Sequence, residues 1–538
     1  MVAFQPSPDG TLIFNGEAVA NFVPQVVNIF RDAARGATSP PVALRVSFMI
    51  RGHTQRKSVD INYAHLDKFN FEAEFPGCVC SNSKGNSTRK LVVRYIREQI
   101  GQMLNTEAGG TYYADSGWYV QLEELRYVIG DQAIGPPMTE EFLIAPAVSR
   151  ISLCYNSNLT SCESAEMLVR ALSRHPNVTL PVFAFTVFGS LRSVLRKEGL
   201  PAACILYISG NQGFGKTRTA KTFSALYHDD DGRLADVYDA RSTEAAMRDA
   251  LVNARDRIVL FDDVCKSTDA RNQTARRNLA ATLARAAANE VPITRMCGKI
   301  AEVVECRASL VITGEFPLET ASDLTRCVMV NIDRQLTGGD DTDRIVVASA
   351  LAGYLQWFAE HSNQELDRLR TEYRDFKAKE RSHREERLQI SLWELSWAFS
   401  SFLRFAVSIE AISQRVVEQM DASLTVTLGK IFNTTLAKLD KQKLRSLDTI
   451  TTLIQAGIRG RGFPWFEHNG CLCVRSHDLT AYVAQVSDNP SLGVNEVTAK
   501  LREKGLLLMD ETGKSTRKVN GIRVLTIPIE RLNNQGGK

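Results

Sequence analysis

The sequence has no apolar run approaching the roughly 20 residues that a membrane-spanning helix needs. Its N-terminal stretch, MVAFQPSPDG, has no basic segment followed by an apolar core, which a secretory signal would require. We therefore expect no membrane association and a cytoplasmic location.

The sequence also lacks a strong charge of one sign and a metal-binding spacing of cysteines. The formal net charge is +4 and the pI about 8.4, so any contact with nucleic acid must come from local basic patches. Of the eleven cysteines, Cys78 and Cys80, like Cys471 and Cys473, are separated by a single residue, a shorter spacing than zinc sites use. We interpret these cysteines as reduced residues of strands or of the core.

The composition is that of a folded globular protein, with 44% hydrophobic and 23% charged residues among 538, a length that implies several domains. Strand-like alternation (VALRVSFMIRG) fills the first part, and PVFAFTVFGSLRSVLRKEG predicts a buried helix. Short apolar strands (CILYIS, RIVLF, SLVIT, CVMVNI) then alternate with helical segments, as in a parallel sheet covered by helices. The fold class is therefore α/β.

Two patterns describe the C-terminal part. Leu366, Leu369, Tyr373 and Phe376 form a 3-4-3 stripe on a charged run, which predicts an amphipathic helix. A helix through Val494 to Leu501 followed by the strand-like RKVNGIRVLTI suggests a winged helix, a module that can bind DNA or mediate other contacts. The predicted domains are a strand-rich accessory domain (1–135), a helical connector (136–200), an α/β core (201–335), a helical domain (336–460) and a winged helix (461–538).

The segment ILYISGNQGFGKTRTAKTF contains G-x-x-x-x-G-K-[ST] directly after an apolar strand and before a helix. Glycines let such a loop curl so that backbone N–H groups and the helix N-terminus face phosphate oxygens, while the lysine reaches the terminal phosphates and the threonine helps to hold Mg²⁺. This P-loop predicts ATP and Mg²⁺ as cofactors and an ATPase core over residues 201–335. The expected nucleotide-binding residues are Gly210, Asn211, Gln212, Gly213, Phe214, Gly215, Lys216, Thr217 and Arg218.

A second predicted strand, RIVLFDDV, follows downstream and carries Asp262 and Asp263 near its C-terminal end. Ligands bind at the carboxyl ends of strands in an open parallel sheet. We expect Asp262, with Thr217, to hold the Mg²⁺ shell and Asp263 to orient the attacking water. A pair of helix-capping acids is the alternative interpretation.

Two further residues are candidates for catalysis. Thr313 ends the strand SLVIT, where a sensor of the γ-phosphate would lie. Arg326 precedes CVMVNI and could either reach a neighbouring subunit's nucleotide or form a local salt bridge.

A β-hairpin is expected over VPITRMCGKIAEVVEC, with its turn at Cys297, Gly298 and Lys299. Arg295 and Lys299 would then lie where a phosphate backbone could pass, although an exposed turn lysine is the commoner explanation.

An ordered set of motifs, DSGWYV, LPVFAFTVFGSL, GNQGFGKT, STEAAMRDAL, LFDDV, VITGE and LTRCVMV, runs through most of the chain. In this set the sequence resembles the AAA+ ATPases of phages, integrative elements and staphylococcal cassette chromosomes, which include MCM-like self-loading helicases. The resemblance implies a hexameric ring, an arginine finger at Arg326, a sensor at Thr313, a DNA-facing hairpin at Lys299 and a C-terminal winged helix. Many AAA+ proteins carry Asp-Glu where this chain has Asp262 and Asp263, so the chain departs from the family pattern at Asp263.

The function expected from these features is ATP-driven translocation on, and unwinding of, single-stranded or forked DNA during replication of a mobile element or phage. The alternatives are an ATP-dependent assembly switch or scaffold on DNA, and the remodelling of protein partners. No signature assigns an activity to the N-terminal domain, and Trp118 in DSGWYV is interpreted as a core residue.

Overall fold

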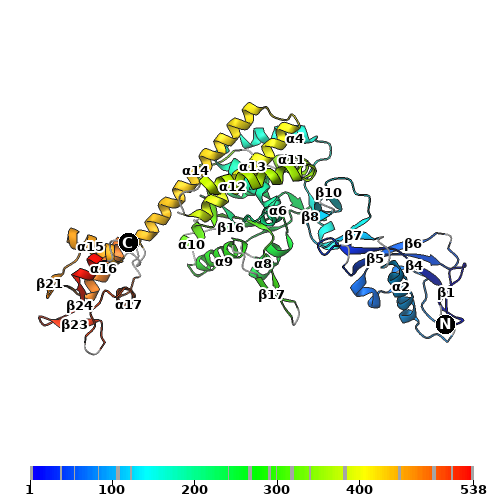
Figure 1. Ribbon diagram of the computed structural model, residues 1–538, viewed down its shortest axis with the longest axis horizontal. Coiled ribbons are helices and arrows are strands. Elements are labelled where there is room, and N and C mark those ends of the chain that lie inside the picture. Colours follow the sequence, from blue (N-terminus) through cyan, green and yellow to red (C-terminus); the bar gives the residue numbers. More distant parts are fainter. Residues whose placement is uncertain are drawn as a thin grey trace. The chain divides into compact units, whose positions relative to one another are not determined.

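In the computed structural model the chain folds into two compact units (Figure 1). The first unit comprises Met1–Leu318 and Thr325–Gly429, and the second comprises Glu319–Leu324 and Lys430–Lys538. The structure describes residues 4–36, 39–53, 55–82, 84–104, 109–121, 124–239, 242–264, 270–288, 293–297, 300–315, 320–337, 341–379, 385–445, 450–487, 492–510 and 513–534. At 263, 270–274, 293–297, 300–303, 321, 341–342 and 440–445 it describes the backbone alone.

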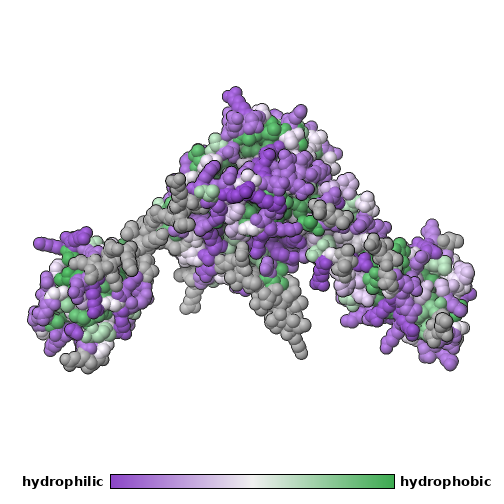
Figure 2. All heavy atoms as spheres, viewed as in Figure 1, coloured by the Kyte–Doolittle hydropathy of each residue, from purple (hydrophilic) through white to green (hydrophobic). Residues whose placement is uncertain are grey.

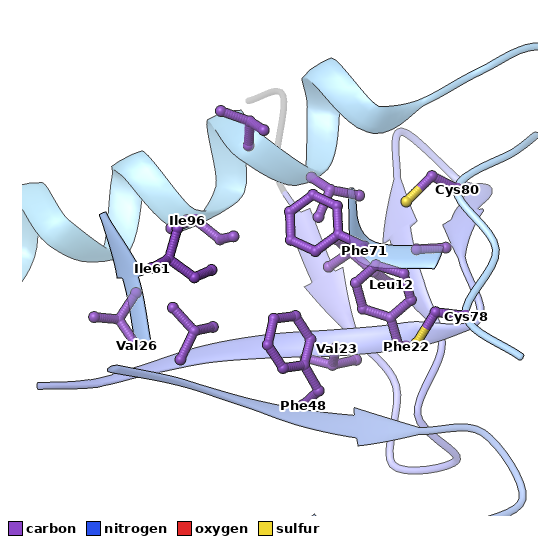
Figure 3. Packing of buried hydrophobic residues seen from close by; sticks show 14 of the residues in the cluster. Leu12, Phe22, Val23, Val26, Phe48, Ile61, Phe71, Cys78, Cys80 and Ile96 are labelled. Carbon is purple, nitrogen blue, oxygen red and sulfur yellow. The ribbon is translucent and has the colours of Figure 1, made fainter. Parts of the chain in front are cut away.

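The N-terminal region is built on a five-stranded mixed sheet of order β11-β7-β4-β5-β6. Helix α2 (Arg89–Met103) packs on β4 through apolar residues that recur at helical spacing. The buried apolar residues between the sheet and α2 form the hydrophobic core of this region, and Figure 3 shows Phe22, Phe48 and Phe71 together with Ile96 of α2 in it. The strands are β4 (Phe22–Asp32), β5 (Pro41–Ile50), β6 (Lys57–Asn62), β7 (Gly110–Tyr113) and β11 (Phe142–Ile144).

Two smaller sheets complete this strand-rich region. They are β1-β2-β3, from β1 (Phe4–Pro6), β2 (Leu12–Phe14) and β3 (Glu17–Ala20), and β10-β9-β8, from β8 (Gly117–Gln121), β9 (Glu124–Ile129) and β10 (Gln132–Ile134). Trp118 at the start of β8 is 2% exposed and donates its indole N–H to the carbonyl of Ser190 at 2.6 Å. Its interpretation as a core residue is confirmed.

The predicted buried helix is α5 (Pro176–Ser190), in which every residue from Val178 onward is buried. An apolar helix without a polar face is stable only when other elements surround it. Here α5 contacts α7, α13 and the strands β16 and β20. Its neighbours in sequence are α4 (Ser161–Leu172), which begins with a capping box of Thr160 and Glu163, and α6 (Arg192–Lys197).

The central sheet has five parallel strands in the order β15-β16-β19-β13-β20. Helices α7 (Lys216–Ser224) and α9 (Ala270–Ala288) both pack against β13, β16 and β19, and α8 (Glu244–Asn253) packs against α9. The predicted parallel sheet covered by helices is confirmed. Its strands are β13 (Ile205–Gly210), β15 (Val237–Tyr238), β16 (Ile258–Val264), β19 (Ser309–Gly314) and β20 (Cys327–Ile332).

A helical layer follows the sheet, with α11 (Asp341–Glu360), α12 (Ser362–Lys379), α13 (Glu386–Ser408) and α14 (Gln414–Arg445). The 3-4-3 stripe forms the inner side of α12: Leu369 is fully buried, and the rings of Tyr373 and Phe376 lie 5.1 and 5.3 Å from that of Trp393 on α13. The predicted amphipathic helix is confirmed.

The second unit contains a four-stranded antiparallel sheet of order β21-β22-β24-β23. The expected helix is α17 (Val494–Glu503), whose Val497 and Leu501 are fully buried, and the expected ribbon is β23 (Thr516–Val519) with β24 (Ile522–Pro528). The other elements are α15 (Ile450–Gly460), β21 (Phe466–His468), β22 (Cys471–Val474), α16 (Ser476–Val486) and α18 (Ile529–Asn534).

The cysteine pairs are buried in their respective cores, as interpreted, and none of them is in a disulfide. Within the described residues there is no cluster of three or more His, Cys, Asp or Glu able to hold a metal. The described helices also include none that is long and apolar enough to cross a membrane. Figure 2 shows mostly hydrophilic residues on the visible face of each unit.

Candidate nucleotide site

The P-loop connects the C-terminal end of β13 to the first turn of α7. Gly210 ends the strand, and a Cβ at this position would lie 2.6 Å from the carbonyl oxygen of Ile332 on the neighbouring β20. Gly215 is the N-cap of α7 with φ of 93°, a left-handed conformation that favours glycine. These two glycines therefore set the path of the loop, and the N-terminus of α7 opens at its end.

The loop is held by the segment that follows β20. The Leu336 N–H donates to the carbonyl of Phe214 at 3.2 Å, and the guanidinium of Arg218 donates to the carbonyl of Leu336. Lys216 is only 8% exposed, and its ammonium donates to the carbonyl of Asn211 across the loop at 2.9 Å. The Lys216 side chain thus points into the loop, whereas the Arg218 side chain connects the start of α7 to the segment after β20.

Asp262 joins the P-loop helix to the neighbouring strand β19. Its Oδ1 accepts hydrogen bonds from the Thr217 hydroxyl at 2.8 Å and from the Thr313 hydroxyl at 2.7 Å. Its Oδ2 lies 3.6 Å from the ammonium of Lys221. Thr313 is fully buried and Asp262 8% exposed, so these polar groups meet at the carboxyl ends of two adjacent parallel strands.

These groups are of the kind that Mg²⁺ and a nucleoside triphosphate bind. Hydroxyl and carboxylate oxygens are the ligands that Mg²⁺ takes from proteins, usually together with phosphate oxygens. Backbone N–H groups at a helix N-terminus and a lysine ammonium suit the phosphates themselves. Thr217 and Asp262 are therefore the pair that would hold the metal, and the loop with Lys216 would hold the phosphates.

Asp263 follows Asp262 within β16, where the pairing with β19 is irregular between Phe261 and Val264. Its side chain lies outside the described part of the structure. A role in orienting water stays a prediction.

Arg326 lies at the opposite end of the sheet from the P-loop. Its carbonyl accepts a hydrogen bond from the N–H of Ile205 at 3.0 Å, at the start of β13, whereas the loop begins at Gly210. At about 3.3 Å per residue, the strand between these two residues spans about 16 Å. The structure therefore does not bring Arg326 into the nucleotide site of its own chain.

The expected hairpin is present as β17 (Ile293–Cys297) paired antiparallel with β18 (Ile300–Val304), with Cys297 opposite Ile300. Arg295 lies opposite Glu302, and only its backbone is described. Gly298 and Lys299 lie outside the described residues, so their proposed part in DNA binding is a prediction.

Sequence reasoning missed Lys221 at this site. The available signal was its spacing, because Lys221 comes four residues after Thr217 on the helix that follows the P-loop, and such residues share a face. The brace from Leu336 was also missed, since no pattern links that segment to the loop.

No family model and no curated protein matches this sequence. Among solved structures, one described as "SCCmec type IV Cch - active helicase" is similar over 99% of both chains, with a TM-score of 0.54 and 13% sequence identity. A structure described as JCV helicase matches over 50% of this chain and 72% of the other chain at 14% sequence identity, with a TM-score of 0.21, which is too low to show a common fold. The chain thus shares the fold of the first structure along its whole length.

Proposed function

We propose that this protein is an ATP-driven DNA helicase or translocase that acts in replication of a mobile genetic element or phage. The observation that carries the proposal is the meeting of Thr217, Asp262 and Thr313 beside an intact P-loop. The full-length fold similarity to a structure described as an active helicase supports the choice among ATPases. So does the strand order, in which the P-loop strand lies between the strand of Thr313 and the last strand, as suits an AAA+ core.

The proposed chemistry divides between a few side chains. ATP bound with Mg²⁺ supplies the phosphoryl group whose transfer to water drives the work. Lys216 and the N-terminus of α7 bind and neutralise the phosphates, and the Thr217 hydroxyl and the Asp262 carboxylate hold the metal. Thr313, the proposed sensor of the γ-phosphate, donates to Asp262 and links it to β19, and Asp263 positions the attacking water.

Arg326 fits this scheme only between subunits. Since about 16 Å of sheet separates it from its own P-loop, it would have to reach the nucleotide of a neighbouring copy. We therefore propose a closed ring, a homo-hexamer as the family resemblance implies, with Arg326 stabilising the transition-state charge at each interface.

The C-terminal unit would supply a DNA contact as a winged helix, and its ribbon supports this role. Lys518 and Arg523 are both exposed and lie directly opposite each other in β23 and β24. Like charges at such positions repel and destabilise a hairpin. From Gly513 to Ile529 the sequence has no Asp or Glu to offset them, so an anionic partner such as a DNA backbone is favoured. In the hairpin of β17 and β18, Arg295 and Lys299 are likewise proposed to face DNA.

The test of the nucleotide site is hydrolysis by two variants. Lys216→Ala removes the phosphate-bound cation, and Asp262→Ala removes the carboxylate that meets both hydroxyls, so each should reduce ATP turnover by at least about a hundredfold. Lys377→Met, which removes an exposed ion pair with Glu386 in the helical layer, is the matched control and should turn over normally. Near-normal turnover in either site variant would refute the site.

The second candidate, a DNA-bound assembly switch governed by ATP, shares the same nucleotide site. A switch differs from a helicase in what ATP does, because assembly on DNA requires ATP binding, whereas a helicase requires continuous hydrolysis coupled to strand separation. Protein remodelling is less favoured, since a remodeller needs neither a basic ribbon nor a DNA-facing hairpin.

A further inference from the structure

The second oxygen of Asp262 faces a lysine whose role neither the P-loop motif nor the family resemblance assigns. Both hydroxyl donors, from Thr217 and Thr313, bind Oδ1, whereas the Lys221 ammonium lies 3.6 Å from Oδ2. The side chain of Asp262 is 12% exposed and that of Lys221 37% exposed. The carboxylate is therefore contacted on both oxygens, by neutral donors on one and by a cation on the other.

Lys221 approaches Asp262 from the side away from the phosphate loop. It follows Thr217 by four residues on α7, so both side chains leave the same face of the helix, and Lys221 is about 6 Å farther along the axis from the loop. Lys216, at the loop itself, is bonded to the Asn211 carbonyl instead. The position of Lys221 suits a contact with the acid and does not suit a contact with the terminal phosphates.

We propose that Lys221 is a positioning residue that fixes the orientation of Asp262 for Mg²⁺. The inference rests on the proposed nucleotide site. A carboxylate held at one oxygen alone can rotate about its terminal bond. With Oδ2 held by the ammonium, Oδ1 stays between the hydroxyls of Thr217 and Thr313, where the metal would be bound. Partners that orient a metal ligand typically govern metal affinity by about 10- to 100-fold.

The alternative is that Lys221 forms an ordinary ion pair without a role at the site. The chain offers a matched control for this, because Lys377 on α12 is 38% exposed and pairs with Glu386. Lys377 belongs to α12 and Glu386 to the first turn of α13, and both elements are separate in sequence from the P-loop, β16 and β19. The two lysines are similarly exposed, but Asp262 is more buried than Glu386, so the melting temperature of each variant is needed to separate a loss of stability from an effect on Mg²⁺.

The experiment measures binding of a fluorescent ATP analogue to the full-length chain during a Mg²⁺ titration, with the melting temperature of each variant recorded beside it. In Lys221→Met the Mg²⁺ concentration for half-maximal enhancement of binding should rise about tenfold. Lys221→Arg, which keeps the charge, should recover most of this loss, and Lys377→Met should match the wild type. Binding without Mg²⁺ should be equal in all four proteins, because Lys221 acts through Asp262.

Three results would overturn the proposal. If Lys221→Met needs the same Mg²⁺ concentration as the wild type, the contact is an ordinary ion pair. If it needs less Mg²⁺, Lys221 competes with the metal for Asp262. If it loses the binding measured without Mg²⁺, Lys221 contacts the nucleotide. If Lys221→Met does not fold, Lys221→Gln provides the same comparison. If the wild type binds no nucleotide at any Mg²⁺ concentration, the proposed function itself fails, and the inference fails with it.

Discussion

The side chain of Asp262 connects two elements that meet at the P-loop, the helix α7 and the strand β19. Its hydrogen bonds reach a helix residue, Thr217, and a strand residue, Thr313, that are far apart in the sequence. A carboxylate buried to this degree requires such partners, since burial without them would cost several kcal/mol. The same contacts that stabilise the carboxylate also present its oxygen beside the P-loop.

A second buried carboxyl group, that of Glu394, should affect the stability of the protein. Glu394 on α13 is fully buried, and burial raises its pKa to about 7, although the N–H of Ala202 and the charge of Arg192 act in the opposite direction. Between its ordinary value of 4.5 and 7, the folded protein keeps a proton that the unfolded chain has released. The free energy of unfolding should therefore fall as the pH rises through this range, by about 3 kcal/mol in all.

Glu394→Gln removes this titration. Between pH 5 and pH 8 the stability of the variant relative to wild type should rise by up to about 3 kcal/mol, measured by denaturant unfolding at both pH values. Glu365→Gln is the control, because Glu365 is equally buried but bonded to Arg404, and loss of that ion pair should destabilise the protein at pH 8. A constant difference between wild type and Glu394→Gln across the range would contradict the account.

Among helices and strands, the sequence predicted correctly those elements whose formation depends on a single local cause. The apolar α5, the stripe on α12 and the strand–loop–helix of the P-loop each follow from periodicity or from glycine geometry, and the structure confirms all three elements. Contacts between elements distant in sequence were not predictable. Examples are the Leu336 brace on Phe214 and the bidentate pair of Arg307 with Asp115, which depend on tertiary folding.

The ribbon of β23 and β24 gives a prediction in which stability and binding change in opposite directions. Lys518→Glu converts the repulsive pair with Arg523 into an attractive one, so the C-terminal unit should become more stable by about 0.2–1 kcal/mol. If Lys518 contacts a DNA phosphate, DNA affinity should fall, and the dependence of log K on log salt should become less steep by about one unit.

Thermal unfolding and a salt series of fluorescence anisotropy measure the two effects. Arg459→Glu makes the same change of net charge on α15, outside the ribbon, and should reduce binding less. Unchanged DNA affinity in Lys518→Glu, or a fall of the same size in both variants, would exclude a specific contact by the ribbon.

At the scale of the whole molecule, the position of Arg326 makes the nucleotide site incomplete within one chain if this residue takes part in catalysis. Arg326→Ala should then bind ATP normally and lose hydrolysis, as expected for an arginine finger, whose removal costs at least about a thousandfold in rate. Mixing it with Lys216→Ala protein should restore part of the activity. In a ring assembled at random from equal amounts, about a quarter of interfaces would combine an intact P-loop with an intact arginine.

The measurement is the ATPase rate across mixing ratios, with each variant alone as the reference. Rates that only average those of the two variants would favour a local role for Arg326. The sequence predicted the residue from its place before the last strand, but the separation from its own P-loop became apparent only from the pairing of β13 with β20.

Unwinding of a forked duplex by the purified full-length protein measures the helicase function that we propose for this P-loop. This function predicts release of the displaced strand that requires both ATP and Mg²⁺, stops with a non-hydrolysable ATP analogue and is absent in Lys216→Ala. Hydrolysis by the wild type without any strand release, or strand release that persists in Lys216→Ala, would contradict it.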